Sequence, residues 1–373
     1  MFSSRFHWDL RPNRLTELLR EKRQASAPIL DLTESNPTHA GLDYPPKVFA
    51  ALADPRALRY EPAPAGMVEA REAVARYYMA RGHVVNPDRV LLTASTSEGY
   101  AYLFKLLCDP GDNVLVPHPS YPLFEFLADM ENVTVHQYPL RYHGEWEIDR
   151  QALAAAVTER TRAIVVVNPN NPTGSFLKRG ELEFLKQLQL PLISDEVFAD
   201  YAFAPDASRV TTLAGEGFAM SGLSKVAGLP QMKLGWIVVP NTEAMERLEW
   251  IADTYLSVST PVQCASSTLL ELGESVQRQI QERCTANLAG LHAALAGSAA
   301  DVLNVEGGWY ATIKMPRIRT EEEWTLELLS KENVLLQPGF FYDFESEAFL
   351  VASLLTPPDV FVEGIRRLRA ALG

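Results

Sequence analysis

The chain has 373 residues, 47% of them hydrophobic, which is enough for two lobes with substantial buried cores. It carries 34 Lys and Arg against 47 Asp and Glu, a net charge of −13, and this acidity argues against nucleic acid as a partner. The three cysteines show no disulfide framework or zinc spacing, and no histidine pair has metal-ligand spacing, so we expect no metal. The N-terminus lacks a signal peptide and no apolar run could span a bilayer, so we expect a cytoplasmic protein that binds no membrane.

Helices and short apolar runs alternate along the first two thirds of the chain. A polar helix is expected over 11–24, followed by a Pro-rich stretch of loop and short helix over 28–64. Further helices are expected over 67–81, 97–108, 121–130, 149–157, 178–188 and 241–256. Strands are expected over 89–93, 113–117, 133–138, 162–168, 190–196, 217–221 and 234–239. This alternation predicts βαβ units and a mostly parallel sheet, with 234–239 as its antiparallel member.

The remainder of the chain has a different pattern. Helices are expected over 262–294, strands near 309–315 and 348–354, and a last helix over 358–371, which indicates a smaller α+β domain. We therefore expect an α/β protein with a three-layer αβα large domain. The predicted division gives residues 1–45 to an N-terminal arm and part of the small domain, 46–256 to the large domain and 257–373 to the small domain.

Ligands of open α/β sheets bind at the carboxyl ends of the strands. The segments that follow the predicted strands are 93–97, 117–121, 168–174, 195–198 and 221–225, and we expect them to share one edge. Asp195 either caps a helix or is a buried anion that pairs with a cationic ring nitrogen. The adjacent amides Asn170 and Asn171 either form a turn or face a ligand.

Three further candidates lie at this predicted edge. Ser95 and Glu98 form a capping box, and the hydroxyl-rich helix start is equally compatible with a phosphate site. Tyr121 is either an interface aromatic or a ring that stacks on a flat ligand. Lys225, between small residues in SGLSKVAGLPQMKLGW, has the setting of a Schiff-base lysine, whose pKa is lowered by desolvation and neighbouring charge.

The motifs NPNNPTG (168–174), SDE (194–196) and GLSK (222–225), followed by Gly235, resemble those of one enzyme family. Weaker matches are Tyr60 with GMVEAREAV (66–74), PSYP (119–122) and GGWY (307–310). In this order and spacing the chain resembles the fold-type I pyridoxal-phosphate enzymes, specifically the class I/II aminotransferases, over nearly its whole length. The resemblance implies pyridoxal 5'-phosphate as cofactor and a homodimer with shared active sites.

The resemblance also implies a role for each matching residue. Lys225 would form the internal aldimine and move a proton, and Asp195 would keep the pyridinium nitrogen protonated. Asn171 would donate to the phenolate oxygen, and Tyr121 would stack on the ring. The residues that would hold the phosphate are Ser95, Thr96, Ser97, Lys233 and, from the neighbouring subunit, Tyr60.

The sequence departs from the family pattern at four positions. Lys233 replaces a phosphate-binding arginine, which keeps the charge but loses the bidentate fork. Phe198 replaces a tyrosine that donates to the phenolate oxygen. Val351 lies where the family has the arginine for the substrate carboxylate, and no arginine occurs between Arg319 and Arg366. Ser35 replaces a glycine of the same pocket, so altered substrate recognition is expected.

The function expected from these residues is amino transfer between an amino acid or amine and a 2-oxo acid. A C–S β-lyase, which would release ammonia, a 2-oxo acid and a thiol, is the nearest alternative. A non-catalytic protein on the same fold is a further alternative, although it would have no reason to retain Lys225, Asp195 and Asn171. The substrate pocket includes Ser35, Trp309 and Val351, and the aromatic residues of the small domain either line it or form ordinary core; they are Trp309, Tyr310, Phe340, Phe341 and Tyr342.

Overall fold

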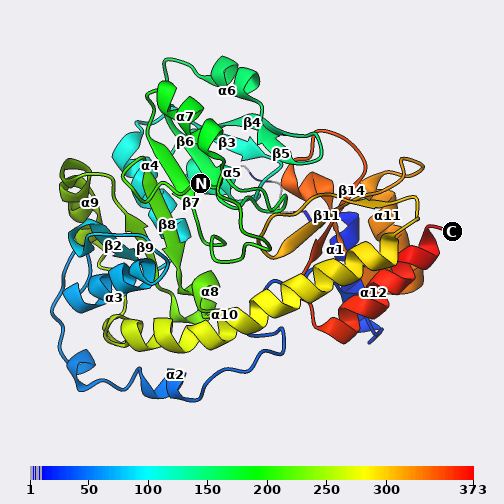
Figure 1. Cartoon of the computed structure of the whole chain (residues 1–373), viewed down its shortest axis with the longest axis horizontal. Coiled ribbons are helices and arrows are strands. Elements are labelled where there is room, and N and C mark those ends of the chain that lie inside the picture. Colours follow the sequence, from blue (N-terminus) through cyan, green and yellow to red (C-terminus); the bar gives the residue numbers. More distant parts are fainter. Residues whose placement is uncertain (1–2, 4, 6–7, 9–10) are drawn as a thin grey trace.

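The computed structural model describes Ser3, Arg5, Trp8 and residues 11–373. Its largest element is an eight-stranded sheet with the order β2-β9-β8-β7-β6-β3-β4-β5 (Figure 1). The strands β9 and β5 run antiparallel to their neighbours, and the other six are parallel. The predicted mostly parallel sheet is therefore confirmed, and so is the antiparallel run after residue 234. The short strand β5 was not predicted. The bounds are β2 (Val90–Thr93), β3 (Asn113–His118), β4 (Thr134–Tyr142), β5 (Trp146–Ile148), β6 (Thr161–Val167), β7 (Leu192–Asp195), β8 (Phe218–Gly222) and β9 (Gly235–Val238).

Helices cover both faces of this sheet because side chains alternate along its buried strands. Leu91 and Met220 face the cluster that contains helices α4, α5 and α9, whereas Leu92 and Ala219 face the opposite cluster with α3. Helices α6 and α7 cover that opposite face further along the sheet. The predicted three-layer arrangement is thus present. The helix bounds are α1 (Arg14–Gln24), α2 (Lys47–Ala50), α3 (Val68–Met79), α4 (Thr96–Leu107), α5 (Phe124–Met130), α6 (Arg150–Ala156), α7 (Arg179–Gln187), α8 (Leu223–Val226) and α9 (Thr242–Tyr255).

A single long helix leads into the second part of the chain. Helix α10 (Thr260–Leu295) has 36 residues, where the sequence predicted helices over 262–294. At about 1.5 Å per residue it is roughly 54 Å long. It packs against α3 near its start and against α12 (Pro358–Ala371) near its end, as the yellow and red helices of Figure 1 show.

The second part contains a four-stranded antiparallel sheet with the order β10-β11-β14-β13. The N-terminal segment packs with this part of the chain through a separate two-stranded parallel sheet of β1 and β12. Strands β11 and β14 and helix α12 were predicted, whereas the short strands were not. The bounds are β1 (Leu30–Asp31), β10 (Asp301–Val302), β11 (Tyr310–Lys314), α11 (Glu321–Glu327), β12 (Val334–Leu335), β13 (Gln337–Pro338) and β14 (Phe349–Ser353).

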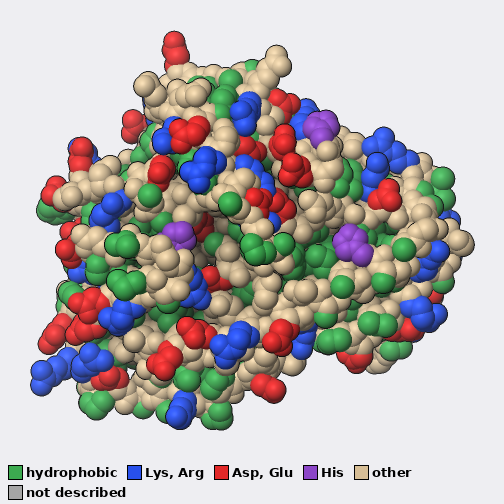
Figure 2. Space-filling model, in the orientation of Figure 1, with side chains coloured by type: hydrophobic (Ala, Val, Ile, Leu, Met, Phe, Trp, Pro, Cys, Tyr) green, Lys and Arg blue, Asp and Glu red, His purple; other side chains and the backbone are tan. Residues whose placement is uncertain are grey.

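The surface in Figure 2 carries acidic and basic side chains that are interspersed over the face shown, without a continuous basic stripe. This distribution agrees with the net charge of −13. Among the described residues, none of the helices combines the length and the hydropathy that crossing a bilayer requires.

Candidate active site

The segments that follow five parallel strands meet at one edge of the large sheet. The register places Val167 beside Asp195 and Asp195 beside Met220, so the loops after β6, β7 and β8 start at the same level. On the other side, Thr93 pairs with Gly235, and Gly235 pairs with Gly222. The single edge predicted from the sequence is therefore formed.

Lys225 lies in α8, a helix of four residues that begins directly after β8. Its amine lies 4.7 Å from the centre of the Trp309 ring and 5.4 Å from that of Phe198. Its backbone carbonyl accepts a hydrogen bond of 2.6 Å from the hydroxyl of Tyr201. Burial lowers the pKa of the Lys225 amine to about 8, although the charge of Asp195 opposes the shift. A substantial share of this amine is therefore neutral, and hence nucleophilic, at mildly alkaline pH.

Asp195 ends β7 and is buried. The hydroxyl of Tyr100 donates to its Oδ2 at 3.2 Å, and the backbone N–H of Val197 donates to its Oδ1 at 3.2 Å. Burial raises the pKa of Asp195 to about 6 in spite of these two bonds. A cation beside this carboxylate would lower its pKa toward the usual value of an aspartate. The residues after Asp195 form turns and not a helix, so the helix-cap alternative is wrong.

The adjacent amides of NPNNPTG have different surroundings. Asn170 is fully engaged, because it donates to the Pro119 carbonyl and to Thr173 Oγ1 and accepts from Ser120 Oγ. Asn171 is buried as well, but its Oδ1 has no hydrogen-bond partner. The turn interpretation therefore accounts for Asn170 only, and the amide of Asn171 is available for a ligand.

The start of α4 lies at the same edge, and a glycine allows β9 to approach it closely. A Cβ on Gly235 would lie 3.0 Å from Thr93 Oγ1 and 3.1 Å from Thr96 N. Ser95 caps the helix by accepting from Glu98 N at 3.2 Å. The Glu98 carboxylate accepts from Ala94 N, one residue earlier than a capping box requires, so the predicted box is only half formed.

Two further predicted residues flank this edge. Lys233 is exposed, has a left-handed backbone (φ 51°) and lies two residues before Gly235, next to the start of α4. Tyr121 follows β3 and is 42% exposed, and the charge of Asp195 contributes to its raised pKa. Both side chains can therefore face a ligand that lies over the strand ends.

The small domain contributes the opposite wall. Trp309 is fully buried and its ring packs against Phe198 at 5.3 Å. The backbone N–H of Gly307 donates to the Gly174 carbonyl at 3.1 Å, and a Cβ on Gly174 would lie 2.6 Å from the Gly307 oxygen. Gly174 also has φ 72°, so glycine is required there for both reasons. The two loops are thus in direct backbone contact.

The remaining substrate-pocket candidates lie on the small sheet and beside it. Val351 is fully buried in β14, between Thr312 of β11 and Gln337 of β13. Ser35 lies in the loop that Ser353 holds through a hydrogen bond of 2.6 Å to the Glu34 carbonyl, and the Ser35 side chain partly offsets the effect of burial, which raises the pKa of Tyr310.

The five predicted aromatic residues divide between the site and other packing. Trp309 and Tyr310 contact Phe198 and thus border the site. Tyr342 hydrogen bonds to Gln337 on the small sheet. Phe341 instead packs with Leu15 of α1, so for this residue the core alternative is correct. Phe340 is exposed and packs edge-on against Phe341, with the ring centres 4.9 Å apart.

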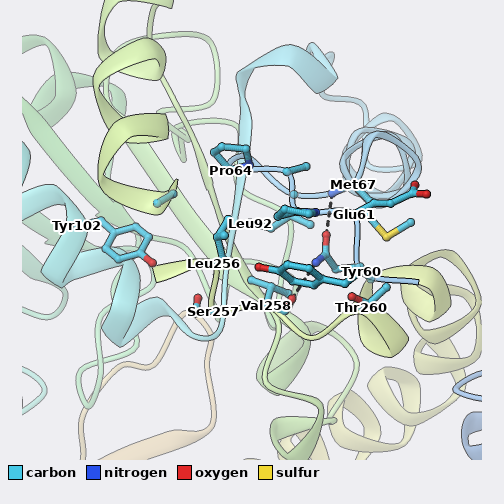
Figure 3. A pocket seen from close by; sticks show the side chains of 15 residues that line it. Tyr60, Glu61, Pro64, Met67, Leu92, Tyr102, Leu256, Ser257, Val258 and Thr260 are labelled. Carbon is cyan, nitrogen blue, oxygen red and sulfur yellow. Dashed lines mark hydrogen bonds between the residues drawn. The ribbon is translucent and has the colours of Figure 1, made fainter. Parts of the chain in front are cut away.

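Tyr60 lies apart from these residues. It is 74% exposed and lines a pocket with Met67, Ser257 and Thr260, and this pocket contains neither Lys225 nor Asp195 (Figure 3). A single chain therefore does not bring Tyr60 to the lysine.

Sequence reasoning missed Tyr100 and Tyr201, which hold Asp195 and the Lys225 backbone. Tyr100 follows TASTSEG directly, so its place in the first turns of α4 was a usable signal. Tyr201 carried none, because its contact with Lys225 depends on a turn geometry that has no sequence pattern.

The described residues fit a flat, phosphorylated cation. Asn171 Oδ1 and Ser221 Oγ are buried polar atoms without partners near the strand ends, and Asp195 is a buried carboxylate that lacks a full countercharge. The start of α4 supplies N–H groups for a phosphate. This donor set is what a pyridine ring with a ring nitrogen, a phenolic oxygen and a phosphate requires.

The comparisons with known proteins agree with this chemistry. The family model "Aminotransferase class I and II" matches residues 27–356, and the chain belongs to this family. The enzyme is thus an aminotransferase, and its cofactor is pyridoxal phosphate. Mouse tyrosine aminotransferase is 24% identical over an alignment of 404 positions, which covers 97% of this chain and 87% of that one.

A second relative is a lyase. The S-alkyl-thiohydroximate lyase SUR1 of Arabidopsis thaliana is 32% identical over 228 residues, which cover 56% of this chain but only 48% of the lyase. Among solved structures, the alanine aminotransferase of Pyrococcus furiosus has a TM-score of 0.88 at 23% identity and covers 100% of this chain and 99% of its own. The structural likeness confirms the predicted fold class.

Proposed function

We propose that this aminotransferase exchanges the amino group between an amino acid or amine and a 2-oxo acid, with Lys225 as the residue that attaches the cofactor and moves the proton. Amino acids and oxo acids are the substrates that the family implies. The observation that carries the proposal is the position of Lys225, whose pKa is lowered to about 8, at the strand ends beside Asp195.

Pyridoxal phosphate, when bound, supplies an electron-withdrawing ring that stabilises negative charge on the substrate carbon next to the amine. Lys225 would hold the cofactor through its amine and, once released, take the proton from that carbon and pass it to the C4′ carbon of the cofactor. Asp195 would keep the ring nitrogen protonated, and Tyr100 would hold Asp195 in place. The buried side chain of Asn171 would donate a hydrogen bond from its Nδ2 to the phenolic oxygen.

The remaining residues would fix the cofactor's position. Tyr121 would stack on the ring, and Phe198 would cover it without donating a hydrogen bond. The phosphate would lie at the start of α4, where it receives hydrogen bonds from Ser95, Thr96 and Ser97 and the charge of Lys233.

We further propose a homodimer in the cytoplasm with the three domain segments expected from the sequence. The exposed Phe49, Leu58 and Tyr60 support the dimer, because three large apolar side chains with 76%, 91% and 74% exposure would gain from burial. Tyr60 would then contact the neighbour's phosphate. Free cysteines at 108, 264 and 284 support a reducing compartment.

The test is a half-reaction screen with purified protein reconstituted with pyridoxal phosphate. An amino donor should convert the visible absorbance of the bound cofactor to that of pyridoxamine phosphate, and Lys225→Ala should abolish both the visible band and the conversion. An unchanged band in Lys225→Ala would reject the role of Lys225. Light scattering coupled to size exclusion would reject the dimer by finding one chain per particle.

A C–S lyase is the second candidate, and it is supported by the lyase SUR1 among the relatives. The same residues would then expel a thiol from the carbon beyond the one that loses the proton. Release of ammonia and thiol from S-alkyl cysteines, without conversion of the cofactor to the pyridoxamine form, would favour this activity.

A further inference from the structure

One face of the small sheet is directed at the large domain, opposite Lys225. The antiparallel register places Tyr310, Thr312 and Val351 on this face, and Gln337 pairs directly with Val351. The opposite face is small-domain core, since Ala311, Ile313, Leu350 and Ala352 belong to one buried cluster. Tyr310 marks the direction of the first face, because its ring lies 6.3 Å from that of Phe198, which borders the Lys225 amine.

Tyr342 connects this face of the small sheet to the edge of the large sheet by hydrogen bonds. The Tyr342 hydroxyl donates to Gln337 Oε1, and its carbonyl accepts a hydrogen bond of 2.9 Å from Ser120 N, next to Tyr121. Thr312, Val351 and Gln337 therefore lie on the surface that continues from Tyr310 toward the Tyr121 loop. A substrate bound to a cofactor under Tyr121 would direct one substituent toward this surface.

The polar groups of this surface near Tyr310 are uncharged, and Lys314, which lies on the same face, is exposed at the other end of β11. Burial raises the pKa of Tyr310 to about 12 and that of Tyr342 well above its usual value, so both phenols keep their protons at neutral pH. Thr312 is fully buried and its hydroxyl has no hydrogen-bond partner. This hydroxyl can donate to a ligand or accept from one, and satisfying it would stabilise the complex.

The charges that act on this surface are predominantly negative. Glu34 raises the pKa of Tyr310, and Asp195 raises that of Tyr121. The cation at the inner end of this surface is Lys225, whose amine lies 4.7 Å from the Trp309 ring, whereas Lys314 lies at the opposite end of β11 from Tyr310. A carboxylate placed here would be desolvated without a countercharge, which is strongly unfavourable.

We propose that the surface formed by Tyr310, Thr312, Gln337 and Val351 selects amino compounds that carry an uncharged group, such as an amide, ester or hydroxymethyl group, in place of a carboxylate beside the amine. This inference rests on the proposed function, because Lys225 must first support amino exchange. In the overall reaction the donor's C–NH2 becomes C=O while the acceptor's C=O becomes CH–NH2, so no outside oxidant is needed. The product formed from such a donor is the corresponding neutral carbonyl compound.

The test compares matched donors in single-turnover half-reactions of the reconstituted enzyme. L-alanine, L-leucine and L-phenylalanine are each compared with their amides and amino alcohols, and rates are referred to the free-base concentration of each amine. For side chains that react, the amide should have a rate constant at least tenfold above that of the acid. Equal or faster reaction of the acids would overturn the inference.

Binding of unreactive analogues gives a second readout that is independent of turnover. Calorimetry should find that 3-phenylpropanamide binds the reconstituted enzyme at least fivefold more tightly than 3-phenylpropanoate. Tighter binding of the carboxylate would overturn the inference. Thr312→Val, which keeps the shape and removes the hydroxyl, should lower the amide's rate constant at least threefold relative to that of the acid.

A substitution that adds a cation provides the converse test. Val351→Arg should raise the ratio of acid to amide rate constants at least tenfold, while Val351→Leu should leave the preference for the amide in place. If Val351→Arg does not fold, the calorimetric comparison and the Thr312→Val variant still test whether the surface prefers an uncharged group. Failure of every donor to convert a Lys225-dependent visible band would instead reject amino transfer itself, which separates the two conclusions.

Discussion

The amine of Lys225 lies 4.7 Å from the centre of the Trp309 ring, although the two residues come from different domains of the proposed division. This ring and the ring of Phe198, whose centre lies 5.4 Å from the amine, bury the amine and lower its pKa, whereas the charge of Asp195 opposes the shift. The lowered pKa of Lys225 is therefore a product of both parts of the chain. Four properties of the site and one of the surrounding structure can be measured directly.

The rate of cofactor attachment should follow the neutral fraction of the Lys225 amine. With a pKa of about 8, roughly one tenth of this amine is neutral at pH 7 and about nine tenths at pH 9. Stopped-flow reconstitution with pyridoxal phosphate should therefore accelerate up to about ninefold over this interval. A midpoint near 10, as for an exposed lysine, would contradict the burial effect.

Replacement of Asp195 by Asn should stabilise the cofactor-free protein and weaken cofactor binding. Burial raises the pKa of Asp195 in the folded state from 3.8 to about 6. The protonated carboxyl group therefore makes the folded state relatively more stable below pH 4, and this contribution is lost as the pH rises through about 6. Because an amide at this position cannot ionise, Asp195→Asn should gain about 1–2 kcal/mol at pH 7.5 in urea unfolding and lose most of its pH dependence between 4 and 6. Asp112→Asn is the opposite control, since Arg162 lowers the pKa of Asp112 and its replacement should destabilise the protein.

Replacement of Tyr100 by Phe should weaken cofactor binding several-fold. The Tyr100 hydroxyl donates to Asp195 and favours its ionised form, so its loss raises the pKa of Asp195 further. The free energy of unfolding of Tyr100→Phe should be about 1 kcal/mol lower than that of the wild type. Tyr138→Phe removes a similarly buried bond, to the Val165 carbonyl, and should lower stability without changing the cofactor's dissociation constant. Equal effects of both variants on cofactor affinity would indicate a purely structural role.

Replacement of Phe198 by Tyr should shift the spectral titration of the bound cofactor. Phe198 borders the Lys225 amine and cannot donate a hydrogen bond to the phenolic oxygen. A donor at this position stabilises the oxygen's negative charge, so the pH midpoint of the visible band should fall by about one unit. An unchanged or higher midpoint in Phe198→Tyr would contradict this account.

The contact between the GGWY loop and the large domain depends on Glu306. Its carboxylate pairs with Lys178 and Arg209 and accepts from Phe176 N at 3.0 Å, and only 9% of the side chain is exposed. Glu306→Gln leaves Lys178 and Arg209 with Asp206 as their remaining anionic partner and should lower the free energy of unfolding in urea by roughly 1–3 kcal/mol. Glu363→Gln, at an exposed site beside Arg366 and Arg367, should change stability much less than Glu306→Gln does.

The sequence predicted the large sheet, its antiparallel strand and the edge that carries Asp195 and Lys225, because these depend on local hydrophobic pattern and on the general position of ligands in α/β sheets. It did not predict the short strands β1, β12 and β13, since two-residue elements have no detectable period. The sequence also could not show that Asn170 and Asn171 have different hydrogen-bond partners. Both are amides in a turn sequence, and only the contacts of Ser120, Pro119 and Thr173 show which one is occupied.

The backbone contact between Gly174 and Gly307 sets how closely two distant segments of the chain approach each other. A Cβ on Gly174 would lie 2.6 Å from the Gly307 oxygen, and a Cβ on Gly307 would lie 2.6 Å from the Tyr201 oxygen. A side chain at either position would therefore push the two loops apart and break the hydrogen bond of 3.1 Å between them. Because Trp309 follows Gly307 by two residues, the cover over the Lys225 amine depends on the absence of two methyl groups elsewhere in the chain.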